Sequence, residues 1–404
     1  MPHSAAPATE SRYPSTDLIE CPFPHFDRAR EERPVEFDEG SQIYVVYRHE
    51  DITFVLGHPE IFPHQPVHDN GIMFGGVPLI SSVGPPEHTA MRRLAFEPLK
   101  PGRLKSYEPV IAEISDSLID AFHERGSVDF VEQFAIPLPA RVVCRLMAFP
   151  EEGPDFEFIV ESLSMKSADR PGTSDVGIGF DRGAKRTGIH DYIRDALEER
   201  HANPGNDILT EILQTQITRD GSLNLPLLMT ICTELAAGGV ITTAQMMVNA
   251  LMLLLAHPDQ MARVRADHKL IPWVLEESLR LESPVQSEPR ISVADATVGG
   301  VHVPAGSTVL LVLGSGNRDP ERFTEADRFD IDRPRDQIKA HLGFGYGMHF
   351  CLGAPLARLE GTIGFRRLFD RLAEIRLAEG NDFAHIASTH FRALRSLRID
   401  FDRP

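Results

Sequence analysis

The most informative segment of the sequence is Phe344-Gly345-Tyr346-Gly347-Met348-His349-Phe350-Cys351-Leu352-Gly353. This glycine-rich loop delivers one cysteine to the start of a helical pattern at about Ala354. A thiolate that binds iron in a dry site needs backbone N–H donors aimed at its sulfur, and glycines let the chain bend close enough to supply them. The N-terminus of the following helix lowers the thiol pKa. A lone cysteine is more often a small buried hydrophobe, but this loop favours a ligand role for Cys351.

The loop is similar at every fixed position to the signature FGxGxHxCxG of the cytochrome P450 family. Three further family matches follow it in the next helix, at Ala354, Ala357 and Glu360. The resemblance implies a haem b group, iron protoporphyrin IX, with the Cys351 thiolate as the axial ligand to the iron. The other loop residues that it assigns to the cofactor are Phe344 beside the sulfur, Gly345, and His349 at a haem propionate.

A second segment, Glu277-Ser278-Leu279-Arg280, resembles the ExxR motif of the same family. Residues three apart share a helical face, so Glu277 and Arg280 can pair and support the haem-binding core. Most pairs at this spacing are surface salt bridges that contribute little. Glu276 could equally pair with Arg280 at i+4.

A third segment places His88 and Arg92 four residues apart on one helical face, where two basic groups are mildly unfavourable unless they share an anion. It resembles the family's HxxxR helix, which implies that both side chains bind haem propionates. Arg290, after the ExxR helix, is assigned the same role. The alternative from the residues alone is a solvated basic face that continues into Arg93.

The segment Pro226–Ala256 predicts a long helix through the protein interior rather than a membrane span, because polar residues that are costly in lipid interrupt it. Each interior glycine of Gly238-Gly239-Val240-Ile241-Thr242-Thr243 costs roughly 1 kcal/mol relative to alanine. A flat ligand against the backbone, or a local opening in which a threonine hydroxyl takes over a hydrogen bond, would offset that cost, and so would helix packing through small residues.

The same residues resemble the family pattern AGx[D/E]TT, with Gly238 beside the cofactor and Gly239, Ile241, Thr242 and Thr243 as the catalytic segment. The usual acid is replaced by Ile241, which cannot relay a proton. Thr242 matches the threonine that would hydrogen-bond the bound oxygen. Protons are therefore expected to arrive through water held by Thr242, and a route through another acid stays open.

The expected fold is mainly α (α+β), the cytochrome P450 fold: a helix-rich domain with small β-sheets and the haem between a long central helix and the cysteine-loop helix. Residues 1–16 read as a mobile tail and residues 17–404 as a single domain, because no linker or repeat divides them. Apolar periodicity predicts helices at Val110–His123, Ile189–His201 and Pro355–Leu372. Strands are predicted at Ile43–Tyr47, Ala296–Val303 and Thr308–Leu313, with a turn at residues 304–306 between the last two.

Composition limits the partners and the compartment. The 404 residues carry 41 Lys and Arg against 59 Asp and Glu, a formal charge of -18, which argues against nucleic acid as a partner. The 4 cysteines lie far apart with no CxxC pair, which favours a reducing compartment. With no secretory signal in the first residues, a cytoplasmic monomer without a membrane segment is expected.

The resemblance implies a monooxygenase that inserts one oxygen atom from O2 into a small to medium hydrophobic substrate. Electrons, ultimately from NAD(P)H, are expected through an iron-sulfur ferredoxin or a flavodoxin and its reductase, since the chain ends at Pro404 without a reductase segment. Alternatives are a peroxide-driven peroxygenase or another haem-thiolate reductase, which the loss of the acid at Ile241 favours modestly, and a non-catalytic haem sensor. The expected substrate-pocket residues are Ile72, Met73, Phe74, Leu235, Val285, Thr389 and His390.

Overall fold

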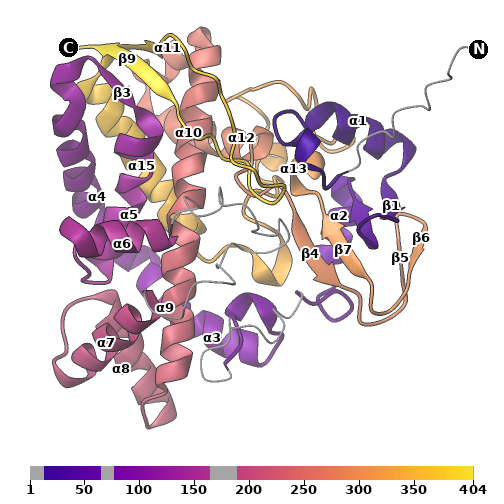
Figure 1. The fold of residues 1–404 in the computed structure, drawn as a ribbon, viewed down its shortest axis with the longest axis horizontal. Helices are drawn as coiled ribbons and strands as arrows, with labels where there is room; N and C mark the ends of the chain where they lie inside the picture. The colour runs from indigo at the N-terminus through magenta and orange to yellow at the C-terminus, as the bar shows by residue number, and fades with distance from the viewer. Residues whose placement is uncertain (1–12, 65–76, 164–188, 404) are drawn as a thin grey trace, which may run out of the picture.

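The computed structural model describes residues 13–64, 77–163 and 189–403 (Figure 1). The helices are α1 (Phe23–Glu32), α2 (His49–Gly57), α3 (Glu87–Phe96), α4 (Pro101–Phe122), α5 (Pro137–Leu146), α6 (Gly153–Leu163), α7 (Ile189–Ala202), α8 (Ile208–Asp220), α9 (Leu225–Gly239), α10 (Ile241–Ala256), α11 (Pro258–Ala266), α12 (Ile271–Leu281), α13 (Leu313–Gly316), α14 (Arg335–Ile338) and α15 (Ala354–Arg371). The strands are β1 (Val35–Asp38), β2 (Ile43–Val46), β3 (Ser127–Asp129), β4 (Glu288–Ile291), β5 (Ala296–Val298), β6 (Val301–Val303), β7 (Thr308–Leu311), β8 (Ala373–Leu377) and β9 (Arg398–Asp402).

The three helices predicted from apolar periodicity are present as α4, α7 and α15. Helix α4 begins earlier than expected, at Pro101, because a proline fits the first turn of a helix, and it continues through Pro109. Helix α15 begins at Ala354, directly after the cysteine loop. The sequence therefore predicts the limits of α7 and α15 closely, and it is wrong on the start of α4.

The long apolar segment forms two nearly continuous helices, α9 and α10, that meet at Val240. The Thr242 hydroxyl donates to the carbonyl oxygen of Gly238 at 2.7 Å. The expected single helix is thus interrupted, and a threonine hydroxyl takes over a hydrogen bond at the interruption. The span Leu225–Ala256 is long and apolar enough to cross a membrane, with a mean hydropathy of 1.7, but 61% of its most apolar window is buried inside the protein.

Within the described residues, the strands form three small sheets. The first has the order β1-β2-β7-β4, in which β2 and β7 are parallel and the outer pairs are antiparallel. The second has the order β3-β9-β8. The single strand expected at Ala296–Val303 is wrong: the segment is a hairpin of β5 and β6 whose turn is Gly299-Gly300, both with positive φ (54° and 82°). Adjacent glycines at positive φ are what a tight hairpin turn requires.

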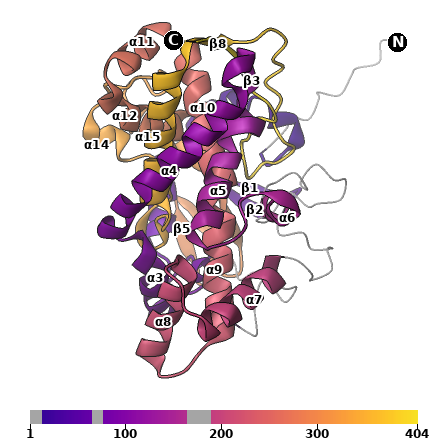
Figure 2. The ribbon, with the colours of Figure 1, turned by 90° about the vertical axis from the view of Figure 1, so that its left-hand side faces the viewer.

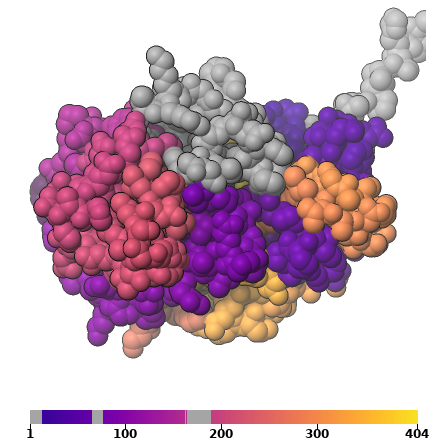
Figure 3. All heavy atoms as spheres, turned by 90° about the horizontal axis from the view of Figure 1, so that it is seen from below, coloured from indigo at the N-terminus to yellow at the C-terminus, as the bar shows by residue number. Residues whose placement is uncertain are grey.

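Most helices lie on one side of the molecule, and the β1-β2-β7-β4 sheet lies on the other together with α1, α2 and α13 (Figure 1). Helices α9 and α10 run along the inner edge of the helical part. In Figure 2, α4 and α5 cross in front of α10 and α15, and α4 packs against α15. Seen from below, the surface of α3 lies between that of α7 and α8 and that of the β5–β6 hairpin (Figure 3).

The N-terminal segment joins the fold earlier than expected. Tyr13 is 3% exposed, packs edge-on against Phe26, and its hydroxyl donates to the carbonyl oxygen of Thr389. Within the range expected as a tail, residues 13–16 therefore belong to the folded part, because an aromatic ring with a satisfied hydroxyl is buried there.

Candidate active site

The cysteine loop bends at Gly345 and Gly347, whose φ values of 73° and 71° lie in the left-handed region that favours glycine. A Cβ on Gly347 would approach the carbonyl oxygen of Leu56 to 3.0 Å, so the loop also needs glycine for space. The backbone N–H of Cys351 donates to the carbonyl oxygen of Phe344 at 2.8 Å, which closes the loop.

The sulfur of Cys351 accepts hydrogen bonds from the backbone N–H groups of Gly353 and Ala354, at the start of α15. Burial raises the pKa of the Cys351 thiol, and these N–H groups, followed by Arg92 and Arg358, oppose that shift without cancelling it. A bound metal cation would complete the balance, because a coordinating thiol is deprotonated outright. The donor set thus fits a thiolate ligand that becomes charged when it binds iron.

Four basic residues expected at the haem propionates come together beside this loop. His88 is 2% exposed, its ring centroid lies 4.6 Å from that of His349, and its Nε2 is buried without a hydrogen-bond partner among the described residues. Burial, together with His88, Arg290, His64 and Arg92, lowers the pKa of His349 to about 3. A solvated basic face is therefore wrong for His88.

Among the described residues, few carboxylates balance the positive charge of the cluster of His88, Arg92, Arg290 and His349. Arg290 is 5% exposed and lies 3.5 Å from Glu288, while Arg92 donates to the carbonyl oxygen of Phe350 at 2.7 Å. A buried polar nitrogen without a partner is costly unless a ligand satisfies it. The orphaned His88 Nε2 among cations therefore fits an anionic group, and the haem propionates are of this kind.

The two glycines of the segment 238–243, where α9 meets α10, have different surroundings. A Cβ on Gly238 would meet nothing within 4 Å, and this residue is exposed, so open space lies over the backbone there. A Cβ on Gly239 would lie 3.4 Å from Val143, which is packing between helices. Gly238 thus leaves room for a flat ligand, whereas Gly239 serves close packing. Thr243 is buried, and Ile241 and Thr242 are half-buried.

The ExxR pair is fully buried and belongs to a larger network. Arg280 donates to both carboxylate oxygens of Glu277 at 2.7 and 2.9 Å, and Arg333 donates to the same carboxylate at 3.0 Å. Arg280 also donates to the carbonyl oxygens of Asn317 and Ala326. The network ties α12 to the irregular segment that precedes the cysteine loop.

Glu276 does not pair with Arg280, so that alternative is wrong. Its carboxylate accepts hydrogen bonds from Arg358 at 2.5 and 2.9 Å and lies 2.9 Å from Nε2 of His341. Burial works to raise the pKa of Glu276, but these hydrogen bonds outweigh it and lower the pKa to about 2. The Arg358 guanidinium lies 4.5 Å from the centre of the Phe344 ring, so Glu276 holds a cation next to the cysteine loop. Sequence reasoning missed this contact because the partners are far apart in the chain.

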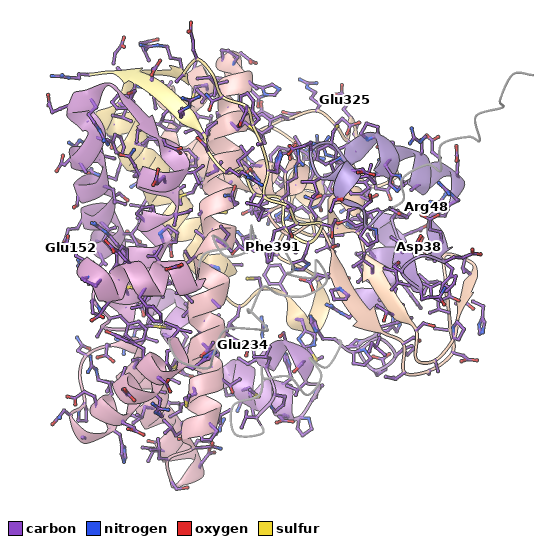
Figure 4. The ribbon with its side chains drawn as sticks, viewed as in Figure 1. Asp38, Arg48, Glu152, Glu234, Glu325 and Phe391 are labelled. Atoms are coloured by element: carbon purple, nitrogen blue, oxygen red, sulfur yellow. The ribbon has the colours of Figure 1, made fainter. Side chains whose placement is uncertain are left out.

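The expected substrate-pocket residues are only partly described, because Ile72, Met73 and Phe74 lie outside the described residues. Val285 pairs with Phe391 through a β-bridge, and Thr389 and His390 are each 8% exposed in the adjoining loop. Leu235 is half-buried on α9. Figure 4 shows Phe391 in the region between α9–α10 and the β1-β2-β7-β4 sheet, and it shows Glu234 lower on α9, near α3.

The chain is similar in sequence to known proteins of one family. The family model for cytochrome P450 matches residues 177–373. The chain is 34% identical to cytochrome P450 109 of Bacillus spizizenii over 88% of this chain and 86% of that protein. It is 35% identical to vitamin D(3) 25-hydroxylase of Pseudonocardia autotrophica over 80% of this chain and 77% of that protein.

Solved structures of the family have the same fold. CYP109E1 of Bacillus megaterium, crystallised with corticosterone, superposes with a TM-score of 0.81 at 27% identity, over 95% of this chain and 99% of that one. The sequence relatives match over most of their own length, and the solved structure has the same fold. The chain belongs to the cytochrome P450 family of haem-thiolate monooxygenases.

Proposed function

We propose that this protein inserts one oxygen atom from O2 into a small to medium hydrophobic substrate, by C–H hydroxylation or a related oxidation. When bound, the haem supplies the iron at which O2 is bound and reduced. The observation that carries the proposal is the loop that presents Cys351 beside a partly buried basic cluster, in which His88 Nε2 is buried without a hydrogen-bond partner among the described residues. That pair of features suits a cofactor with a metal centre and carboxylate arms.

Each proposed role rests on a position already described. Cys351 would be the axial ligand and Phe344 would pack beside it. The propionates would be held by His88, Arg92, Arg290 and His349. The buried pair of Glu277 and Arg280 would stabilise the segment that leads into the cysteine loop.

Proton supply is proposed to run through Thr242. Its hydroxyl hydrogen is donated to the carbonyl oxygen of Gly238, so its oxygen lone pairs face outward and can hold a water. Ile241 offers no proton-relaying group. Water held at the Thr242 hydroxyl, rather than a carboxylate at that turn, would deliver the protons that oxygen reduction requires.

The proposed substrate class follows from apolar side chains and from relatives. Val285, Phe391 and Leu235 supply apolar surface on two sides of the region beside α9. One relative is named vitamin D(3) 25-hydroxylase, and the related CYP109E1 was crystallised with corticosterone. Vitamin D(3) and corticosterone are both hydrophobic molecules. A hydrophobic small molecule is the substrate class that these features favour.

Electrons are proposed to come from NAD(P)H through a reductase and an iron-sulfur ferredoxin or a flavodoxin. Three cations that could steer such a partner are already paired. Arg358, over the Phe344 ring of the cysteine loop, pairs with Glu276, Lys100 pairs with Glu97, and Arg103 pairs with Glu211. Exposed Tyr346 and Phe350, at 49% and 38%, present apolar surface on the loop itself. Electrostatic steering of the partner should therefore weaken only moderately with salt.

The chain is further proposed to act as one domain and as a cytoplasmic monomer. Its largest core cluster draws buried residues from Ile80 to Phe401, which supports a single domain.

The test compares two ways of driving product formation. The holoenzyme receives a binding substrate with either NADH, ferredoxin and reductase, or hydrogen peroxide alone. A monooxygenase forms product with the electron-transfer system, with NADH consumption coupled to product. Product with peroxide only would favour the peroxygenase, for which the replacement of the acid by Ile241 is the specific support. No product under either condition, with a bound ligand, would favour a haem sensor.

A further inference from the structure

Glu234 lies on α9, on the same helical face as Gly238 and Thr242, the residues proposed to lie beside the haem and the bound oxygen. It precedes Gly238 by four residues and Thr242 by eight, and residues four apart on a helix lie one above the other. The hydrogen bond from Thr242 to Gly238 preserves this alignment across the interruption at Val240. Gly238, between the other two, faces open space. The helical face between the Glu234 carboxylate and the Thr242 hydroxyl therefore has the open backbone of Gly238 at its centre.

The surroundings of Glu234 give it hydrogen bonds but no strong cation. Its carboxylate accepts from the backbone N–H of Ile80 at 2.7 Å and from the Ser81 hydroxyl at 3.2 Å. Among the described residues no arginine or lysine pairs with it. Burial raises the pKa of Glu234, and the contacts with Ile80 and Ser81, followed by the charge of His64, only partly oppose this.

Among the described residues, no cation pairs with the buried Glu360 either, and its Oε2 has no hydrogen-bond partner. Glu277, Glu276 and Glu282, by contrast, each pair with at least one arginine. An anion held in an apolar region without such a partner is costly, and a ligand cation would remove the cost. Within the part of the chain that the structure describes, α9 thus carries an anionic group without a strong counter-charge.

We propose that Glu234 is a specificity determinant that binds a protonated amine at the far end of an otherwise apolar substrate, and this rests on the proposed monooxygenase function. Eight helical residues rise about 12 Å, so the oxidised carbon should lie on the order of 10 Å from the nitrogen. The competing explanation is that Glu234 serves only to hold the turn at Ile80–Ser82.

The test uses optical titration of the ferric holoenzyme with matched pairs of rigid hydrophobic compounds. The two members of a pair differ only in a terminal dimethylammonium or an isopropyl group, which have the same shape. Loss of water from the iron shifts the Soret band to the blue, whereas direct nitrogen ligation shifts it to the red, and such compounds are set aside. The wild type should bind the amine about tenfold more tightly than its isostere, or better, as one hydrogen bond to a charged group provides.

The Glu234→Gln variant should lose that preference while its affinity for the isopropyl compounds stays within about twofold. Ser81→Ala is the matched control, because it weakens the contact with the turn but keeps the carboxylate, and it should retain the preference. Equal binding of both members by the wild type, or an equal loss for both members in Glu234→Gln, would overturn the proposal. Each sample is first reduced under carbon monoxide: a wild type without the thiolate-type Soret band contradicts the proposed function, whereas a normal band without amine preference contradicts the role of Glu234 alone.

Discussion

Replacing Glu277 by glutamine should destabilise the protein far more than the same change at the surface. Glu277 is the shared anion of Arg280 and Arg333, and all three side chains are at most 3% exposed. The variant leaves two buried guanidinium groups without their carboxylate, and breaking a buried pair in this way costs about 3–5 kcal/mol.

The size of the expected shift in melting temperature follows from chain length. Unfolding entropy is about 2.1 cal/mol/K per residue, so the 404 residues give about 0.85 kcal/mol/K. A loss of about 3–5 kcal/mol then lowers Tm by about 4–6 °C. The matched control is Glu325→Gln, whose partner Arg328 lies 2.9 Å away in a pair that is 64% and 60% exposed. Figure 4 shows Glu325 at the periphery. An exposed pair is worth at most about 1 kcal/mol, which corresponds to about 1 °C.

The assay is thermal unfolding of both purified holoenzymes, followed by circular dichroism and by the Soret band. Haem release should accompany the lower Tm of Glu277→Gln, because the network holds the segment that leads into the cysteine loop. The reasoning is refuted if Glu277→Gln melts within about 1 °C of the wild type, or if Glu325→Gln lowers Tm equally.

Three further predictions follow from the site. His88→Leu should speed transfer of haem to apomyoglobin by about tenfold or more, since a hydrogen bond to a charged propionate is lost; an unchanged rate would remove His88 from the haem contacts. Ile241→Asp should change turnover, peroxide release or the solvent isotope effect, because it restores an acid beside Thr242; if all three stay the same, the missing acid is irrelevant to proton supply. Glu276→Gln should lower Tm at pH 6, because the pKa of Glu276 is lower in the folded protein than in the unfolded chain and the ionised carboxylate therefore stabilises the fold. The difference in Tm should shrink as the pH falls from about 4.5 toward 2 and the carboxylate is protonated. Equal Tm differences at pH 6 and at pH 3 would contradict the pairing with Arg358 and His341.

Local signals predicted much of the architecture. The cysteine loop, the start of α15 and the pairing of Glu277 with Arg280 depend on residues close together in the chain, and the structure places them as expected. The hairpin of β5 and β6 was missed although Gly299-Gly300 is a strong turn signal, because the apolar residues on both sides resembled one strand.

Contacts between distant parts of the chain were harder to foresee. Glu276 could have paired with Arg280 by spacing alone, but the fold brings Arg358 and His341 against it. Burial of Tyr13 depends on the loop that contains Thr389. Both outcomes are decided by tertiary packing, which local patterns do not encode.

Spectroscopy of the reduced, carbon monoxide-bound protein tests the central claim that Cys351 is the thiolate ligand of the haem iron. The wild type, Cys144→Ser and Cys232→Ser should all show the strongly red-shifted Soret band of a thiolate-ligated haem, and Cys351→Ser should lose it. The claim is contradicted if the freshly purified wild type lacks that band, or if Cys351→Ser retains it.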